Sequence, residues 1–425
     1  MKFRPFKPVQ NLMAAVILLT TLLACAEMWL RSRGVTLPST VSSTVAPDLQ
    51  PLLEPCDSCF HHLRAGAATL AAGVKTEIHA PGYRGEAVQV PKPAGVYRGV
   101  LLGDETVFGP AIPDDRTLAA WLQQLLRKSA GTHIEVVNAG LPGSCPLLAW
   151  LHYQQQLRSL QPDLVILHFD MSDVADDADY RRYLVLNEST SSTDAGSIVS
   201  PESAAAVEQS ATHPHVLAID GTPGAPRCIH PLISCEQKTE NVVVGKVCRS
   251  AIGTWLISQA RAFVGEDAAL SHRYTPEQAP FAWIGDNPPD LRIQVRHTLE
   301  PIEQLREAVK SDGGELLVTT APVLWQLQPA SDAPLLSERF QIDGVTPYSR
   351  TWSFRVIREY CAAIHVPFLD VTDAFRQSGL GAKLFSPTAP VLSEYGTVLY
   401  ARELAHAITS GNAQVSLHLR DQQPR

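Results

Sequence analysis

The stretch VYRGVLLG, residues 96–103, is a short apolar run that ends in glycine. Apolar residues then recur at helical spacing through Leu118, Leu122 and Leu125. A continuous apolar run of about four to eight residues next to a turn residue is typical of a strand buried on both faces. The stretch therefore predicts a buried strand followed by an amphipathic helix, the repeating unit of an α/β fold.

The same alternation continues along the chain on both sides of a long interval. Further strands are predicted at IEVV (134–137), LVILHF (164–169), ELLVTTAP (315–322) and VPFLDV (366–371). Helices are predicted at about 147–160, around Ile302, Leu305 and Val309, at 350–364 and at 395–409. Continuous apolar strands separated by helices predict a parallel sheet covered on both faces, and so a three-layer α/β/α sandwich.

The interval between the two halves has a different composition. Residues 185–290 are rich in Ser, Thr, Pro and Gly and contain Cys228, Cys235 and Cys248. We expect a peripheral insertion that contributes no central strand and holds a disulfide between two of these cysteines. The predicted organisation is an N-terminal membrane anchor or signal at 1–33, a linker and extension at 34–80, an α/β domain at 81–184 and 291–411 interrupted by the insertion at 185–290, and a polar tail at 412–425.

The overall composition is that of a globular protein. Of the 425 residues, 45% are hydrophobic and 18% are charged, which excludes a disordered chain or a coiled coil. The net charge is −8 and the pI is near 6.0. Because no excess of basic residues marks a phosphate-binding surface, we expect no nucleic-acid partner. We expect no cofactor either.

The N-terminus predicts export. Lys2, Arg4 and Lys7 precede a charge-free run from Pro8 to Ala26, close to the roughly 20 apolar residues that span a bilayer. Three interpretations remain open: an uncleaved signal anchor, a lipoprotein signal in which residues 22–25 (LLAC) resemble a lipobox, and a cleaved secretory signal. The cationic flank favours a single-pass protein with its N-terminus inside and its bulk in the periplasm or on the cell surface.

A CxxC motif, Cys56 to Cys59, closes the proline-rich residues 34–60, which are expected to form a linker. His61 and His62 follow it directly. The motif could be a redox site, half of a zinc site, or a disulfide in an oxidising compartment. We favour the disulfide because the sequence contains no second CxxC.

Five segments resemble the conserved blocks of the SGNH or GDSL hydrolase family, in the family's order. They are YRGVLLGDETVFGPAIPDDRTLAAWLQQLL (97–126), NAGLPG (138–143), PDLVILHFDMSDVADD (162–177), ELLVTTAPV (315–323) and LFSPTAPVLSEYGTVLYARELAHAI (384–408). The resemblance implies a flavodoxin-like parallel sheet and the activity of an esterase or acyltransferase. A GYRG segment at 82–85 is similar to the branch of that family that carries an N-terminal membrane helix.

The chain departs from the family at the positions that carry its chemistry. The family's serine nucleophile corresponds to Glu105, and its oxyanion-stabilising asparagine corresponds to Ser172. Its aspartate and histidine correspond to Thr388 and Val391. Of the four residues that name the family, the resemblance leaves only the oxyanion glycine, Gly140.

These replacements predict the loss of ester hydrolysis. A serine esterase needs a hydroxyl activated by an imidazole that a carboxylate orients. Val391 cannot accept a proton and Thr388 cannot orient an imidazole, and loss of a triad member costs on the order of 10⁴ to 10⁶ in rate. We therefore expect a degenerate, non-catalytic binding or scaffolding protein of the cell envelope, with an acyl or glycan group as a possible ligand. The alternative is an active esterase or acyltransferase that acts on ester-linked acyl groups of envelope glycans or lipids through a relocated nucleophile.

Four carboxylates, Asp104, Glu105, Asp170 and Asp173, follow predicted strands, and ligands bind at this edge of an open parallel sheet. Together they could hold a cation. They could equally bond turn amides and cap short helices, and this simpler role makes us expect no metal. His168, at the end of its strand, is either a base or a hydrogen-bonded core residue.

Overall fold

The computed structural model describes residues 46–181, 280–342, 347–348 and 350–411, apart from 47, 57, 72, 131–132 and 287, together with two short strands at 184–185 and 227–228. All of them belong to one unit, which spans 44–230 and 276–425. The predicted anchor or signal at 1–33 and the tail at 412–425 lie outside the described residues. Within the described part of the chain, no helix has both the length and the apolar character needed to cross a bilayer.

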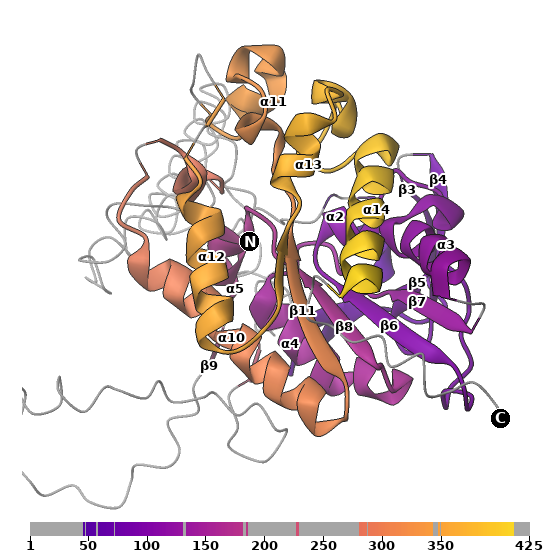
Figure 1. Ribbon diagram of the computed structural model, residues 1–425. Helices are drawn as coiled ribbons and strands as arrows, with labels where there is room; N and C mark the ends of the chain where they lie inside the picture. The colour runs from indigo at the N-terminus through magenta and orange to yellow at the C-terminus, as the bar shows by residue number, and fades with distance from the viewer. Residues whose placement is uncertain are drawn as a thin grey trace, which may run out of the picture. The chain divides into compact units, whose positions relative to one another are not determined.

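The centre of the unit is an eight-stranded sheet with the order β12-β11-β8-β6-β7-β5-β4-β3 (Figure 1). Its parallel strands are β6 (Tyr97–Leu102), β7 (Ile134–Asn138), β8 (Leu164–His168), β11 (Glu315–Thr320) and β12 (Phe368–Asp370). In register, Val100 of β6 lies opposite Val137 and Val165 of its two neighbours. Numbered along the chain, these strands have the flavodoxin-like order 2-1-3-4-5, which confirms the predicted fold class.

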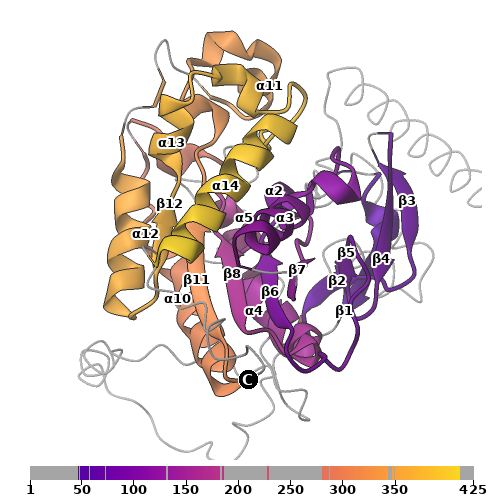
Figure 2. The same cartoon turned by 45° about the vertical axis from the view of Figure 1, so that its right-hand side comes forward.

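Helices cover both faces of this sheet. On one face α3 (Leu118–Ala130) packs against α14 (Glu394–Ser410), as Figure 2 shows. On the other face α10 (Arg292–Ser311) packs against α4 (Pro146–Gln155) and α5 (Asp173–Arg181). Every residue of β6 and β8 is buried between the helical layers, which is why their sequences read as continuous apolar runs.

The predicted helices and strands of the core are all present. The helix expected at 147–160 is α4 followed by a separate 3-10 turn, η3 (Leu157–Leu160). The helix expected at 350–364 is α12 (Trp352–Ala363), which packs against β12. Boundaries elsewhere differ from the prediction by only a few residues, as expected when helix and strand ends are set by capping and by neighbouring strands.

The linker prediction is wrong for the described end of residues 34–60. A 3-10 turn, η1 (Gln50–Leu52), leads into the hairpin of β1 (Leu53–Cys56) and β2 (Phe60–Leu63). Antiparallel β3 (Ala68–Ala71), β4 (Val74–His79) and β5 (Tyr83–Arg84) then extend the main sheet beyond β7 (Figure 2). The proline content of this segment is typical of a linker. The segment is nevertheless folded, because Leu52, Phe60 and Leu63 are fully buried.

Most of the predicted insertion lies outside the described residues, as do the side chains of Cys228, Cys235 and Cys248. Its described start, β9 (Leu184–Val185), pairs with β10 (Arg227–Cys228) in a ribbon separate from the main sheet. Its described end, 280–290, contributes to the core. Trp283 is fully buried there, and its indole N–H donates to the carbonyl oxygen of Met171 at 2.5 Å.

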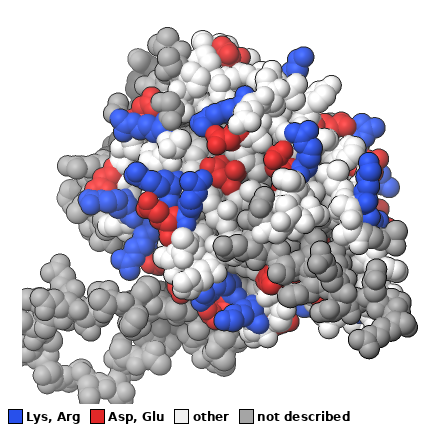
Figure 3. All heavy atoms as spheres, in the orientation of Figure 1, with Lys and Arg blue, Asp and Glu red and all other residues white. Residues whose placement is uncertain are grey.

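The surface of the unit is mixed in charge. Lys and Arg side chains lie beside Asp and Glu side chains across the face shown in Figure 3. Interspersed charges of both signs are typical of a solvated protein surface. The carboxylates of functional interest are instead buried at the edge of the sheet.

Candidate functional site

The site begins at the carboxyl end of β6, where the chain turns sharply into α2 (Glu105–Phe108). Asp104 is the N-cap of this helix, and its Oδ1 accepts a hydrogen bond from the backbone amide of Thr106 at 2.9 Å. Glu105 is the first helical residue. Asp104 thus bonds a turn amide, as predicted, and the position that corresponds to the family's nucleophile lies at the start of a helix.

The carboxyl group of Glu105 is held by the backbone of the second sequence block. Its Oε1 accepts a hydrogen bond from the amide of Gly143 at 3.2 Å. Burial raises the pKa of Glu105 to about 7, while the hydrogen bond from Gly143 acts in the opposite direction. A side chain at the nucleophile position therefore accepts a hydrogen bond instead of presenting an activated hydroxyl.

Gly140 is required by packing. A Cβ at this position would lie 2.4 Å from the backbone nitrogen of Phe108, far inside van der Waals contact. Asn138 reinforces this close approach, because its Oδ1 accepts from the Gly140 amide at 3.1 Å and its Nδ2 donates to the carbonyl of Val107 at 2.9 Å. The presence of this glycine is therefore explained by packing and is not evidence of catalysis.

Arg84, from the GYRG segment, donates hydrogen bonds to carbonyl groups at and after the end of α2. Its guanidinium is fully buried and donates to the carbonyls of Phe108, Gly109 and Ile112 at 2.8, 2.9 and 3.0 Å. Its Nε donates to Asp114 Oδ1 at 2.8 Å. Burial lowers the pKa of Arg84, and Asp114 opposes this effect. The sequence alone does not reveal this role, because the partners of Arg84 lie in another block.

Ser172 does not provide the oxyanion contact of the family's asparagine. Its amide donates to Asp170 Oδ1 at 2.8 Å, and its hydroxyl donates to Asp176 Oδ2 at 2.8 Å. Asp173 Oδ2 in turn accepts from the amide of Asp170 at 2.9 Å. The residues of this block therefore form a closed network at the start of α5, which satisfies their own backbone groups.

The last block forms a turn before α14. The amide of Ser386 donates to the carbonyl of Val391 at 2.8 Å, and the hydroxyls of Ser386 and Thr388 are 3.2 Å apart. Thr388 is exposed and Val391 is half-buried. The hydroxyl of Thr388 cannot replace a carboxylate, and the hydrocarbon side chain of Val391 cannot accept a proton.

A small pocket joins the blocks. Pro390 and Leu392, on either side of Val391, line it together with Thr106, His168 and Asp170. Its cavity volume is about 10 Å³, which is room for about one water molecule. The structure therefore brings the neighbours of Glu105, Ser172 and Val391 to one place at the carboxyl ends of the strands.

His168 is a buried member of a hydrogen-bonded chain. Its Nδ1 lies 2.8 Å from the hydroxyl of Tyr400, and Tyr400 Oη donates to Thr319 Oγ1 at 3.0 Å. Burial raises the pKa of Tyr400. Among the hydrogen bonds between described residues at this end of the sheet, none joins a serine, threonine or free cysteine side chain to the imidazole.

The carboxylates near His168 are buried and repel one another. Burial first, and then neighbouring carboxylates, raise the pKa of Asp104 and Asp173 well above the usual range. Burial also raises the pKa of Asp176, with the hydroxyl of Ser172 opposing it. Burial acts in the same direction on Asp170, but its interaction with His168 lowers its pKa overall.

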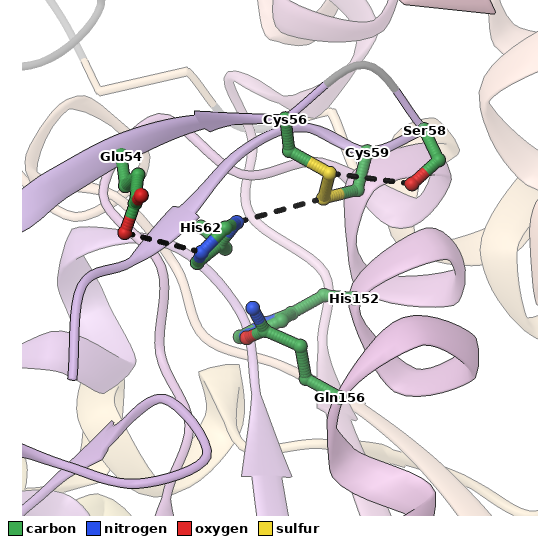
Figure 4. Close-up of a disulfide and its surroundings, with 7 residues drawn as sticks. All are labelled: Glu54, Cys56, Ser58, Cys59, His62, His152 and Gln156. Carbon is green, nitrogen blue, oxygen red and sulfur yellow. Dashed lines mark hydrogen bonds and ion pairs between the residues drawn. A yellow bond between two sulfur atoms is a disulfide. The ribbon is translucent and has the colours of Figure 1, made fainter.

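The CxxC motif lies in the β1–β2 hairpin, which contacts the second block through His61, whose Nε2 is 3.2 Å from the carbonyl oxygen of Pro142. Cys56 and Cys59 form a disulfide, as predicted (Figure 4). The ring of His62 lies between them and Glu54, with Nδ1 3.9 Å from Cys59 Sγ and Nε2 3.7 Å from Glu54 Oε2. Two sulfurs bonded to each other are not available as thiolate ligands, so the half-zinc-site interpretation does not apply to this state. His152, from α4, is drawn below the hairpin (Figure 4).

No protein-family model matches the chain, and no curated protein sequence matches it. Among solved structures it is similar to Axe2, an acetylxylan esterase from Geobacillus stearothermophilus, at 12% identity and a TM-score of 0.33, over 72% of this chain and 92% of that chain. It is also similar to a lipase/acylhydrolase from Enterococcus faecalis, at 12% identity and a TM-score of 0.37, over 74% and 96%. A third similar structure is LAE5, an α/β hydrolase enzyme from the metagenome of Lake Arreo, Spain, at 10% identity and a TM-score of 0.35, over 73% and 94%.

The fold of this chain is SGNH-hydrolase-like. This assignment rests on the 2-1-3-4-5 order of its parallel strands and on the sequence blocks that meet at their carboxyl ends. The activities named for the similar structures belong to those proteins. The chemistry of this chain follows from its own residues.

Proposed function

We propose that this chain is an exported, membrane-tethered protein of SGNH-hydrolase-like fold that does not hydrolyse esters and serves in binding or scaffolding at the cell envelope. One observation carries the proposal: the nucleophile position is Glu105, whose carboxyl group accepts a hydrogen bond from the Gly143 amide. A carboxylate that attacked an ester would form an anhydride and would still need a base to clear it.

Among the described residues, no imidazole stands at the family's histidine position. Val391 stands where the family has its histidine, and the imidazole of His168 is bonded through Nδ1 to Tyr400 and not to a hydroxyl nucleophile. Cys145, the thiol just after the second block, is buried, and burial raises its pKa well above the usual range, which disfavours the thiolate. Acyl transfer by the family's route therefore lacks both its nucleophile and its proton acceptor.

The pocket suits a small group. Phe385, Pro390 and Leu392 provide an apolar wall, and Thr106 and Asp170 provide polar atoms beside it. Its cavity volume of about 10 Å³ holds about one water molecule, so a ligand would enter it only with a small terminal group. We propose an acyl-bearing envelope glycan or lipid as the ligand class, bound without turnover.

The test uses the full chain in detergent, assayed for hydrolysis of p-nitrophenyl acetate and for labelling by a fluorophosphonate probe. We expect neither above background. The four-residue variant Glu105→Ser, Ser172→Asn, Thr388→Asp and Val391→His is the positive arm, and the same variant without Glu105→Ser is its matched control. Only the combined change is informative, because triad members act as a unit. Esterase activity in the unmodified chain that disappears when another Ser or Cys is replaced would overturn the proposal and favour a relocated nucleophile.

The membrane tether rests on the charge-free run from Pro8 to Ala26 and its cationic flank. We expect the full chain to sediment with membranes and its α/β unit to be accessible from outside the cytoplasm. Replacing Cys25 by Ser separates two forms of anchoring, since only a lipoprotein would lose its acyl chains. We expect no change, because Met28, Trp29 and Leu30 continue the apolar character after Glu27. Recovery of the unmodified chain in the soluble fraction would indicate a cleaved signal.

A further inference from the structure

The imidazole of His168 has one nitrogen that no hydrogen bond satisfies. The side chain is buried, with a relative exposure of 3%, and Nε2 has no hydrogen-bond partner among the described residues. Asp170 Oδ2 lies 3.6 Å from it, beyond the roughly 2.7–3.2 Å of an N–H···O hydrogen bond. An unpaired polar atom at this depth costs about 1–3 kcal/mol.

The other ring nitrogen determines which proton His168 carries. Thr319 Oγ1 donates to the carbonyl of Leu369 at 3.0 Å and therefore accepts from Tyr400 Oη. Tyr400 Oη has then used its only proton, so it accepts from Nδ1–H of His168 at 2.8 Å. In the neutral ring this leaves the lone pair on Nε2. A hydrogen bond from one nitrogen that fixes the tautomer is the usual setting of a metal-binding histidine.

Two carboxylates face that lone pair. Asp104, His168 and Asp170 are all buried, and each offers a donor atom within 4.8 Å of the other two. Two ligands of a tetrahedral zinc ion, with bonds of about 2.0–2.1 Å, lie roughly 3.4 Å apart. The 3.6 Å between Nε2 and Asp170 Oδ2 is close to that separation.

The charge of the cluster is not balanced by arginine or lysine. Among the described residues, no Lys or Arg forms an ion pair with Asp104, Asp170, Asp173 or Asp176. The next carboxylate on α5, Asp177, does have such a partner in Arg181. A buried carboxyl group without such a partner is either protonated or bound to a cation, and His168 is the one ionisable partner of Asp170 among the described ion pairs.

We propose that Asp104, His168 and Asp170 bind a divalent cation, with Zn²⁺ as the best match to one imidazole and two carboxylates. Three protein ligands leave a fourth coordination position. Since His168 and Asp170 line the pocket, a ligand in the pocket could take that position. The site is independent of the proposed loss of ester hydrolysis, since it uses none of the family's catalytic positions.

The test is metal binding by the full chain in detergent, after EDTA treatment and dialysis. We expect isothermal titration with Zn²⁺ to show one site per chain, with micromolar affinity or tighter, and Mg²⁺ and Ca²⁺ to bind at least tenfold more weakly. His168→Gln and Asp170→Asn should each weaken Zn²⁺ binding at least tenfold. His365→Gln, a change at an exposed histidine, is the matched control and should leave it unchanged.

A second measurement covers variants that do not fold. Zinc-edge X-ray absorption of the unmodified, Zn²⁺-loaded chain should show only nitrogen and oxygen neighbours at about 2.0–2.1 Å, with imidazole scattering. Absence of Zn²⁺ binding, sulfur in the coordination sphere, or unchanged affinity in folded His168→Gln would each overturn the proposal. Loss of binding in His62→Gln would overturn it too, by assigning the metal to the hairpin cluster of Cys56, Cys59 and His62.

Discussion

Glu105 accepts a hydrogen bond from the backbone amide of Gly143, with Oε1 3.2 Å from the nitrogen. The contact ties the turn after β6 to the loop after β7, the two segments that in a serine hydrolase of this fold would hold the nucleophile and the oxyanion glycine. Here the same segments are held together by a buried carboxyl group. The contacts around α2 therefore stabilise the fold, and variants that remove them should lower the free energy of unfolding.

Gly140→Ala should destabilise the protein by about 2–4 kcal/mol, because the new Cβ would overlap the backbone of Phe108, which cannot move like a side chain. Gly99→Ala is the control, since a Cβ there meets nothing closer than Val136 at 3.8 Å and should cost under about 1 kcal/mol. Urea unfolding followed by circular dichroism measures both. Equal stabilities would show that the close approach of Gly140 to α2 is absent in solution.

Arg84→Met should reduce the free energy of unfolding by about 3 kcal/mol, because it leaves three buried carbonyls without a donor. Arg84→Lys should recover little, since an ammonium cannot reach the same set of acceptors as a planar guanidinium. Arg292→Met, at an exposed position, is the matched control. Thermal melting of the three variants is sufficient, and a Lys variant as stable as the unmodified chain would contradict the guanidinium geometry.

One contribution to stability, that of His152, should be lost as the pH drops below about 6.5, while the raised pKa values of Glu105, Asp104 and Asp173 act in the opposite direction. Burial lowers the pKa of His152 to about 4, against the hydrogen bond to Gln156, while the unfolded chain keeps a value of about 6.5. Between these values the unfolded chain binds more protons, so this contribution is complete above pH 6.5 and is lost toward pH 4. The full difference amounts to about 3 kcal/mol.

His152→Gln should remove this contribution, so that the variant loses less stability, or gains more, toward low pH than the unmodified chain does, because glutamine keeps a donor and does not titrate in this range. The measurement is the free energy of unfolding in urea at several values between pH 4.5 and 7.5. His365→Gln, at an exposed position, should leave the slope unchanged. A slope that is the same in His152→Gln and in the unmodified chain would mean that His152 is not buried in neutral form.

Chemical labelling should distinguish two pairs of cysteines, one free and buried and one joined by a disulfide. Cys145 and Cys361 are free and buried, so iodoacetamide should label them only after unfolding. Cys56 and Cys59 should stay unlabelled in denaturant and react only after reduction, because they are bonded to each other. Peptide mass spectrometry of non-reduced protein distinguishes the four positions, and labelling of Cys56 before reduction would contradict the disulfide.

The parallel core could be predicted because its strands are buried on both faces. Residues 164–167 (LVIL) and 316–318 (LLV) are continuous apolar runs, and such runs are recognisable without knowledge of their neighbours. The antiparallel extension was missed for the opposite reason. Strand β4, VKTEIH, is only half-buried and gains its stability from pairing with β3 and β5, which a local pattern does not record.

The sequence by itself determined which chemistry is missing. Glu105 and Val391 are a carboxylate and a hydrocarbon whatever their surroundings, so an activated serine and its imidazole are excluded at those positions. Only the tertiary structure decided what the remaining groups do. Gly140 meets Phe108, and His168 meets Tyr400 across 232 positions of sequence, because the order of the strands brings distant segments to one edge of the sheet. Burial and partners, which set hydrogen bonds and protonation, exist only once those segments are packed together.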